Sequence, residues 1–148
     1  MGPKVTIESA TLINKGLEII EAYHLFDIPL ERIEVKVDPE CQIHAIVKFE
    51  NGETVAYISP PDMREHIKNA FTHILGEPSS KSVQPIEISK HQLQNPDHET
   101  FPGIKLVLEA FSQNRTKSFI KKEEKVINQF LNNEIKFLKI FKCLRGFL

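Results

Sequence analysis

The chain has 148 residues, of which 41% are hydrophobic and 26% are charged, and its formal net charge is −1. This composition suffices for the core of one ordinary domain, and the apolar runs are far too short for a membrane span. No secretory signal is expected, because the first residues lack a charged segment followed by an apolar one. A cytoplasmic location is therefore expected.

The first stretch combines a short β-like run, Lys4 to Ile7, with a helix whose N-cap is expected at Ser9. Helical periodicity divides that helix into an apolar stripe around Gly16 and a polar face. The stripe contains Leu12, Ile13, Leu17, Ile20 and Tyr23, and the polar face contains Thr11, Asn14, Lys15, Glu18 and Glu21.

The polar face admits two interpretations. One is a solvated helix surface, which periodicity alone favours. The other is an anion site at the helix N-terminus, followed by a metal-binding carboxylate. Ser9, Asn14 and Lys15 carry the donors that a phosphate requires, and Glu18 is a hard oxygen ligand suited to Mg²⁺ or Mn²⁺. One carboxylate does not complete a divalent site.

The middle of the chain predicts strands. Arg32 to Val37 and Gln42 to Phe49 alternate polar and apolar residues, and Glu53 to Ile58 follows as a partner strand. Asn51-Gly52 predicts a type I′ hairpin turn. In the second strand, one face is expected to hold Ile43, Ala45, Val47 and Phe49. A meander of strands laid against the first helix is the expected core, which gives an α+β fold with a short antiparallel or mixed sheet packed on helices.

The remaining elements are mostly helical. Asp62 is expected to cap a helix that runs to about Leu75 and ends at Gly76. Its buried stripe would contain Met63, Ile67, Ala70, Phe71 and Ile74. Polar composition from Glu77 to Thr100 predicts a linker or a long surface loop. Two helices then follow, Ile104 to Ser112 and Thr116 to Asn133, and a basic amphipathic segment closes the chain from Lys136 to Leu148.

Charge is distributed unevenly along the chain. Residues 1–113 carry 10 Lys and Arg against 17 Asp and Glu, whereas residues 114–148 carry 9 against 3. A basic tail is typical of proteins that bind nucleic acid or an anionic membrane. Here the basic residues alternate with apolar ones at helical spacing, which favours the solvated side of amphipathic helices. Neither nucleic acid nor a membrane is expected as a partner. Binding of the basic tail to an anionic membrane surface is kept only as a weaker hypothesis.

Residues 1–27, MGPKVTIESATLINKGLEIIEAYHLFD, closely resemble the start of the catalytic core of the 1-deoxy-D-xylulose 5-phosphate reductoisomerases. The Ser-Ala-Thr and Asn-Lys-Gly-Leu-Glu blocks have the spacing found in that family. The likeness continues from Arg32 to Ala56 and through Pro60-Pro61-Asp62-Met63-Arg64, and it becomes patchy from Gly76 onward.

The resemblance implies an NADPH- and divalent-metal-dependent enzyme, using Mn²⁺, Mg²⁺ or Co²⁺. It would convert a small phosphorylated sugar, 1-deoxy-D-xylulose 5-phosphate, to 2-C-methyl-D-erythritol 4-phosphate in non-mevalonate isoprenoid synthesis. By motif match Ser9, Asn14, Lys15 and Glu18 would bind substrate, and Glu18 would also bind the metal. Met63 would lie near the nicotinamide of NADPH. No catalytic residue is assigned in this chain.

The chain also departs from the family pattern, and these departures are the basis for a second functional hypothesis. The nucleotide-binding domain and the Asp-Ser-Glu block have no counterpart here. Asp38-Pro39-Glu40-Cys41 stands where the family has His-Pro-Gln-Ser, and Ile120 to Glu124 stands in place of Asn-Ala-Ala-Asn-Glu. The expected organisation is a truncated catalytic core (residues 1–75), a linker (76–100) and a partial C-terminal helical region (101–148).

Two functional hypotheses follow. The chain is a truncated catalytic portion of a reductoisomerase-like enzyme, or it is a non-enzymatic remnant that keeps the α+β core and acts as an interaction module. The remnant would self-associate through hydrophobic surface on its sheet, which makes a homodimer a possible assembly.

Overall fold

The computed structural model describes residues 2–60, 62–76 and 83–148, and the side chain of Met63 is also outside the described part. Within these residues the chain forms six α-helices and a three-stranded antiparallel sheet, which confirms the α+β fold. It divides into two compact units, Met1–Val35 with Pro96–Leu148, and Lys36–Asn95. The boundaries of these units differ from those of the three parts expected from the sequence. The three-part domain organisation stays a prediction.

The first unit is helical. It contains α1 (Pro3–Ala10), α2 (Ile13–Phe26), the short 3₁₀ turn η1 (Leu30–Arg32), α4 (Gly103–Ser112), α5 (Thr116–Leu131) and α6 (Phe137–Arg145). Helices α4, α5 and α6 follow the expected segments closely, because their apolar residues recur at helical spacing and pack inward.

The β-like run expected at the start of the chain is wrong, because Lys4 to Ile7 lies inside α1. Its β-branched residues favour a strand, but Pro3 suits the first turn of a helix and α1 packs against α2 and α5. Ser9 therefore lies in the last turn of α1 instead of at an N-cap. The N-cap of α2 is Leu12, whose φ of 60° is left-handed and breaks the chain into two helices.

The core of the first unit comes from four helices. One connected cluster of buried residues forms it: Ile13 and Ile20 of α2, Leu106, Val107 and Ala110 of α4, Phe119 and Val126 of α5, and Ile140, Phe141 and Leu144 of α6. The sequence predicts a core of strands against the first helix, whereas the buried side of α2 packs on the other helices of the first unit and the sheet belongs to the second unit. Each of these helices has its apolar residues along one face, and the helices bury these faces against one another.

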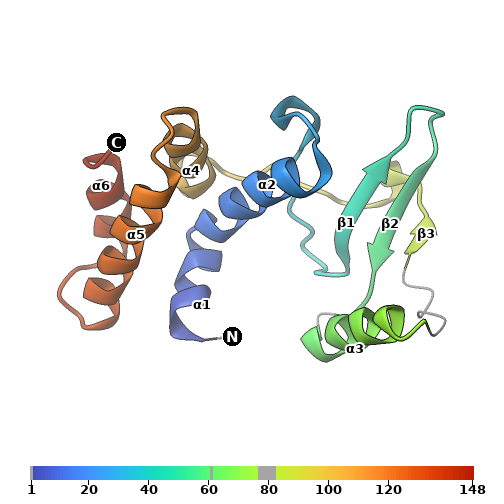
Figure 1. Ribbon diagram of the computed structural model, residues 1–148, viewed down its shortest axis with the longest axis horizontal. Coiled ribbons are helices and arrows are strands. Elements are labelled where there is room, and N and C mark those ends of the chain that lie inside the picture. Colours follow the sequence, from blue (N-terminus) through green and yellow to red (C-terminus); the bar gives the residue numbers. More distant parts are fainter. Residues whose placement is uncertain (1, 61, 77–82) are drawn as a thin grey trace. The chain divides into compact units, whose positions relative to one another are not determined.

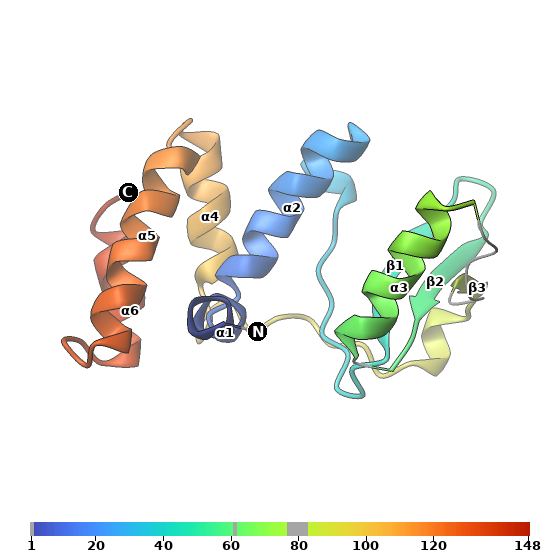
Figure 2. The ribbon, with the colours of Figure 1, turned by 60° about the horizontal axis from the view of Figure 1, so that its bottom comes forward.

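Two glycines allow α2 and α4 to pack closely, and Figures 1 and 2 show these helices side by side. A Cβ on Gly16 would lie 2.8 Å from the Val107 Cβ, and a Cβ on Gly103 would lie 2.1 Å from the Thr11 carbonyl oxygen. Thr11, expected on the polar face, is buried, and its hydroxyl donates to the carbonyls of Ile7 and Glu8 at 2.8 and 3.1 Å.

The second unit contains β1 (Ile43–Lys48), β2 (Thr54–Ile58), α3 (Met63–Ile74), β3 (Val83–Pro85) and the 3₁₀ turn η2 (Ile88–Lys90), with strand order β1-β2-β3 (Figure 1). The predicted hairpin is confirmed, but its turn differs from type I′. Only Gly52 has positive φ, at +89°, and its amide donates to the Phe49 carbonyl at 3.0 Å. This is a three-residue loop with a left-handed glycine.

The expected faces of the second strand are wrong. A bulge between Ile43 and Ala45 shifts the alternation, so that Ile46 lies opposite the buried Ala56 while Val47 and Phe49 are each 50% exposed. The predicted strand from Arg32 to Val37 is also wrong, because only Val37 pairs, with Gln94. Of the predicted linker, residues 77–82 lie outside the described residues, and Val83–Pro85 forms β3.

Asp38, one of the departures from the family pattern, has a structural role. Its carboxylate accepts from the backbone amides of Glu40, Gln42 and Ile43 at 3.0, 2.8 and 2.8 Å, which closes the loop before β1. These amides, that of Ile43 foremost, hold the pKa of Asp38 below its ordinary value.

The α3 helix begins as expected, with the Asp62 carboxylate accepting from the Arg64 amide at 3.0 Å. Its predicted buried stripe is wrong, because Ile67, Phe71 and Ile74 are 53%, 61% and 76% exposed. Polar groups join α3 to the sheet instead, as the Tyr57 hydroxyl accepts from the Asn69 amide at 3.1 Å. His66 Nδ1 lies 3.1 Å from the same hydroxyl.

Among the described residues, no helix combines the length and the apolar character that crossing a membrane requires.

The close approach at Gly103 gives a test of the helical core. We expect Gly103→Ala to lower the free energy of unfolding by about 1–3 kcal/mol, because its methyl group would overlap the Thr11 carbonyl and force α4 away from α2. Urea denaturation measures the change. Gly146→Ala is the control, since its Cβ would meet nothing closer than 3.4 Å and its φ of −71° suits alanine. Equal stability of Gly103→Ala and the unmodified protein would contradict the packing.

Candidate functional site

Three polar side chains of α2 form one hydrogen-bonded group, the Asn14–Lys15–Glu18 cluster. The Asn14 amide donates to Glu18 Oε1 at 2.7 Å, and the Lys15 ammonium donates to Glu18 Oε2. These contacts follow from helix geometry, in which residues three and four apart are neighbours. Asn14, Lys15 and Glu18 of the predicted polar face therefore lie together, and Glu21 of the same face is exposed.

The buried face of α2 determines where the cluster points. Ile13, Gly16 and Ile20 pack into the helical core, so the opposite side of the helix is left at the surface. The side chains of Lys15 and Glu18 are 43% and 42% exposed. A small anionic ligand can therefore reach a cation, an amide and a carboxylate on one helix turn.

The structure does not join the other two predicted site residues to this cluster. Ser9 is half-buried on α1, before the chain turns at Leu12, and within the described residues no side-chain hydrogen bond links it to Asn14, Lys15 or Glu18. Met63 is the first residue of α3 in the second compact unit, and its side chain lies outside the described residues.

The cluster by itself does not make a divalent-metal site. Glu18 is its only carboxylate, and both of its oxygens already accept hydrogen bonds from Asn14 and Lys15. Across the part of the chain that the structure describes, no group of three or more His, Cys, Asp and Glu side chains is placed to hold a metal ion. Mg²⁺ and Mn²⁺ require more oxygen ligands than this arrangement supplies.

Sequence reasoning missed a second polar feature of the helical unit. Glu8 of α1 and Glu123 of α5 are buried, at 7% and 1% exposure, and Lys4 lies 3.5 Å from Glu8. No periodicity could connect positions so far apart in the chain. The only signal was that Glu123 belongs to the segment that departs from the family pattern.

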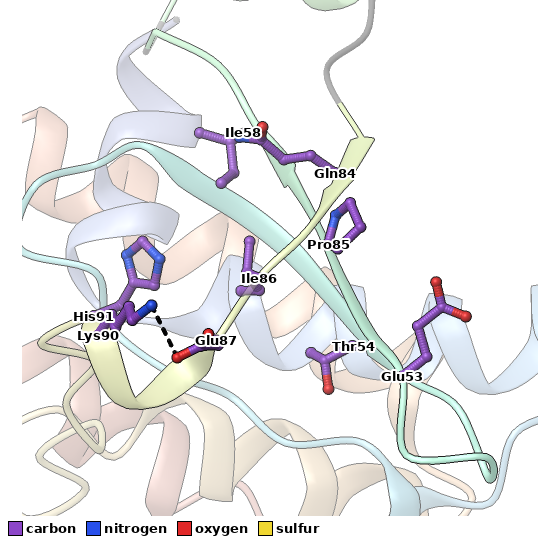
Figure 3. A pocket seen from close by; sticks show the side chains of 9 residues that line it. All are labelled: Glu53, Thr54, Ile58, Gln84, Pro85, Ile86, Glu87, Lys90 and His91. Atoms are coloured by element: carbon purple, nitrogen blue, oxygen red, sulfur yellow. Dashed lines mark ion pairs between the residues drawn. The ribbon is translucent and has the colours of Figure 1, made fainter.

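A pocket of about 600 Å³ lies in the second unit, beside β2, β3 and η2 (Figure 3). Its lining residues are Glu53, Thr54, Ile58, Gln84, Pro85, Ile86, Glu87, Lys90 and His91. The Lys90 ammonium is paired with the Glu87 carboxylate at 3.0 Å, and none of the predicted site residues lines the pocket. It is an open depression on the sheet, and the candidate site remains the cluster on α2.

Comparison with known proteins identifies the family. A model described as the DXP reductoisomerase C-terminal domain matches residues 58–148, and a model of the 1-deoxy-D-xylulose 5-phosphate reductoisomerase C-terminal domain matches residues 1–26. The reductoisomerase of Thermomicrobium roseum is 38% identical over 100% of this chain and 39% of its own length. One from Bacillus thuringiensis is 40% identical over 97% of this chain and 38% of its own.

Solved structures agree. The Zymomonas mobilis enzyme in complex with NADPH aligns with a TM-score of 0.80 and 34% identity, covering 97% of this chain and 39% of its own. A DOX-P reductoisomerase with fosmidomycin and magnesium aligns with a TM-score of 0.81 and 30% identity, covering 99% and 37%. The fold and the motifs are thus those of part of a reductoisomerase. The chain belongs to the 1-deoxy-D-xylulose 5-phosphate reductoisomerase family, and it spans about two-fifths of the length of the curated relatives it matches.

The occupied oxygens of Glu18 predict weak metal binding by the protein alone. We expect a dissociation constant for Mn²⁺ of about 1 mM or weaker, because a single paired carboxylate cannot replace most of the ion's water ligands. Paramagnetic relaxation of water protons during a Mn²⁺ titration measures it. Glu18→Gln and the exposed neighbour Glu21→Gln should change it little. Much tighter binding that only Glu18→Gln abolishes would reveal further ligands.

Proposed function

We propose that this chain contributes substrate-binding groups to a 1-deoxy-D-xylulose 5-phosphate reductoisomerase. The reaction produces 2-C-methyl-D-erythritol 4-phosphate for non-mevalonate isoprenoid synthesis. The observation that supports the proposal most directly is the Asn14–Lys15–Glu18 cluster, which is formed by the Asn-Lys-Gly-Leu-Glu block of a chain that belongs to this family. A cytoplasmic location stays a prediction that accompanies it.

The roles of the cluster residues follow from their chemistry. The Lys15 ammonium is a compact charge for the phosphate oxygens of the substrate, and the Asn14 amide can donate to and accept from its hydroxyl groups. Both groups now bond to Glu18, so the ligand has to replace those contacts when it binds. Ser9 would add a hydroxyl from the end of α1.

NADPH, when bound, supplies the hydride, and a divalent ion polarises the substrate oxygens. Solved relatives are complexes with NADPH and with magnesium, which supports these cofactors for the family. In the proposal Glu18 is one metal ligand among several, and Mn²⁺ and Co²⁺ are alternatives to Mg²⁺. Met63 would contact the nicotinamide. Because the described residues do not complete a metal site, no reaction step is assigned to Glu18.

Substrate binding tests the proposal. Isothermal titration with 1-deoxy-D-xylulose 5-phosphate should show binding that Lys15→Ala weakens about tenfold, which is the effect of losing one charge-assisted hydrogen bond. Fosmidomycin is a second probe, since a solved relative contains it.

Lys105→Ala is the matched control for this titration, because Lys105 is an exposed lysine on α4. It should leave the affinity unchanged. Absence of binding to the unmodified protein would contradict the proposal, and so would an equal loss in both variants.

The non-enzymatic hypothesis has no support from the relatives, since all those compared are named as reductoisomerases. Self-association remains a separate proposal. Exposed apolar side chains of the second unit support it, namely Ile67, Phe71, Ile74 and Leu75 at the C-terminal side of α3 and Val83 of β3.

Sedimentation velocity over a range of protein concentrations tests self-association. We expect a homodimer that dissociates on dilution, because burying these side chains removes apolar surface from water. A monomer at every concentration would contradict this.

A further inference from the structure

Two buried carboxyl groups meet between α1 and α5. Glu123 of α5 is 1% exposed, and Glu8 of α1 is 7% exposed. Helices α1 and α5 pack against each other, and Glu8 is the charged side chain that acts most strongly on Glu123. Carboxylates are rarely buried without a cation or hydrogen-bond donors, so this pair requires an explanation.

The hydrogen bonds of Glu123 are incomplete when both groups are ionised. Within the described part of the chain, the only buried side-chain polar atoms without a hydrogen-bond partner are both oxygens of Glu123 and His98 Nδ1. An ionised carboxylate only accepts hydrogen bonds, so two of them cannot bond to each other. A proton on one of the two would convert it to a donor, so that one oxygen of each carboxyl group could take part in a hydrogen bond between them.

We propose that Glu8 and Glu123 share one proton in the folded protein, forming a carboxyl–carboxylate hydrogen bond that joins α1 to α5. Lys4 lies 3.5 Å from Glu8 and supplies one positive charge. Two carboxyls, one ammonium and one proton give an electrically neutral group, which can be buried at moderate cost.

The electrostatics of the site agree with this arrangement. Burial raises the pKa of Glu123 from its ordinary 4.5 to about 8, the negative charge of Glu8 reinforces the shift, and Lys4 opposes it. Glu124 on the same helix adds a weaker effect in the same direction as Glu8. Five titratable side chains of the other helices packed on α5 are exposed to solvent: Lys105 and Glu109 of α4, and Lys139, Lys142 and Arg145 of α6. The thiol of Cys143 on α6 is half-buried and carries no charge that would compensate Glu123.

A divalent cation fits between the Glu8 and Glu123 carboxyls less well than a proton does. Two carboxylates supply too few ligands for Mg²⁺ or Ca²⁺, and the Lys4 ammonium beside Glu8 would repel the ion. A proton requires only one hydrogen bond between the two carboxyls.

The shared proton links the stability of the helical unit to pH. Because the pKa is raised by folding, the stabilisation is fully present below the unfolded value of 4.5 and is lost as the pH rises through about 8. Folding in this interval therefore takes up close to one proton. This consequence holds whether or not the chain binds the substrate discussed above.

Urea unfolding at several pH values between about 5 and 9 tests the proposal. The unmodified protein should lose stability with increasing pH, with a slope that corresponds to uptake of about one proton on folding. Glu123→Gln should remove that slope and raise the urea midpoint at the alkaline end, because its amide donates to Glu8 at every pH.

Glu124→Gln is the matched control, since it makes the same change of charge at the adjacent exposed position. It should keep the slope of the unmodified protein. The same pH dependence in the unmodified protein and in Glu123→Gln would overturn the proposal.

A second measurement needs no variant. In carbon-13 NMR of the side-chain carboxyls, one glutamate of the unmodified protein should titrate near pH 8, and its infrared spectrum should contain a protonated-acid carbonyl band at neutral pH. Titration of every glutamate near its ordinary pKa would overturn the proposal. So would stabilisation by Mg²⁺ or Ca²⁺ alone that disappears in Glu123→Gln, because the pair would then be a cation site.

Discussion

The packing of α2 on α4 through glycine is the constraint on which the helical unit depends. Gly16 admits Val107, and Gly103 admits the backbone around Thr11, so the two helices approach closely at both points. Because α2 is held along its buried face, the orientation of Asn14, Lys15 and Glu18 is determined by packing rather than by their own contacts. The cluster contributes little to stability, since exposed pairs three or four residues apart are worth about 0.2–0.5 kcal/mol each. Its geometry is a consequence of the core.

The helices that could be predicted from the sequence are those whose apolar stripe faces the core. Apolar residues at helical spacing located α4, α5 and α6 within a few residues. The same rule failed for α3, because Ile67 and Phe71 form a stripe without a buried surface to cover. The spacing of apolar residues predicts which side of a helix or strand is apolar, but it does not predict which other element, if any, packs on that side. The β1 faces failed for a local reason, since a bulge at Ile43 and Ala45 interrupts the alternation.

The candidate site was predictable to the extent that it is local. Asn14, Lys15 and Glu18 lie within two helix turns, so helix geometry alone brings them together. The position of Ser9 could not be predicted, because β-branched neighbours suggested a strand and the helix break at Leu12 has no proline or glycine to signal it. The Glu8 and Glu123 pair depends on how α1 packs against α5. Contacts of this kind arise from the tertiary fold, and propensity scales contain no information about them.

The left-handed backbone of Leu12 has a consequence for the two motifs on either side of it. A non-glycine residue in that conformation costs about 1–2 kcal/mol, and the surrounding packing must supply that energy. Leu12 is therefore a strained turn residue between the Ser-Ala-Thr block and the Asn-Lys-Gly-Leu-Glu block. The packing of both blocks therefore has to hold Leu12 in this conformation, which makes them one structural element instead of two independent motifs.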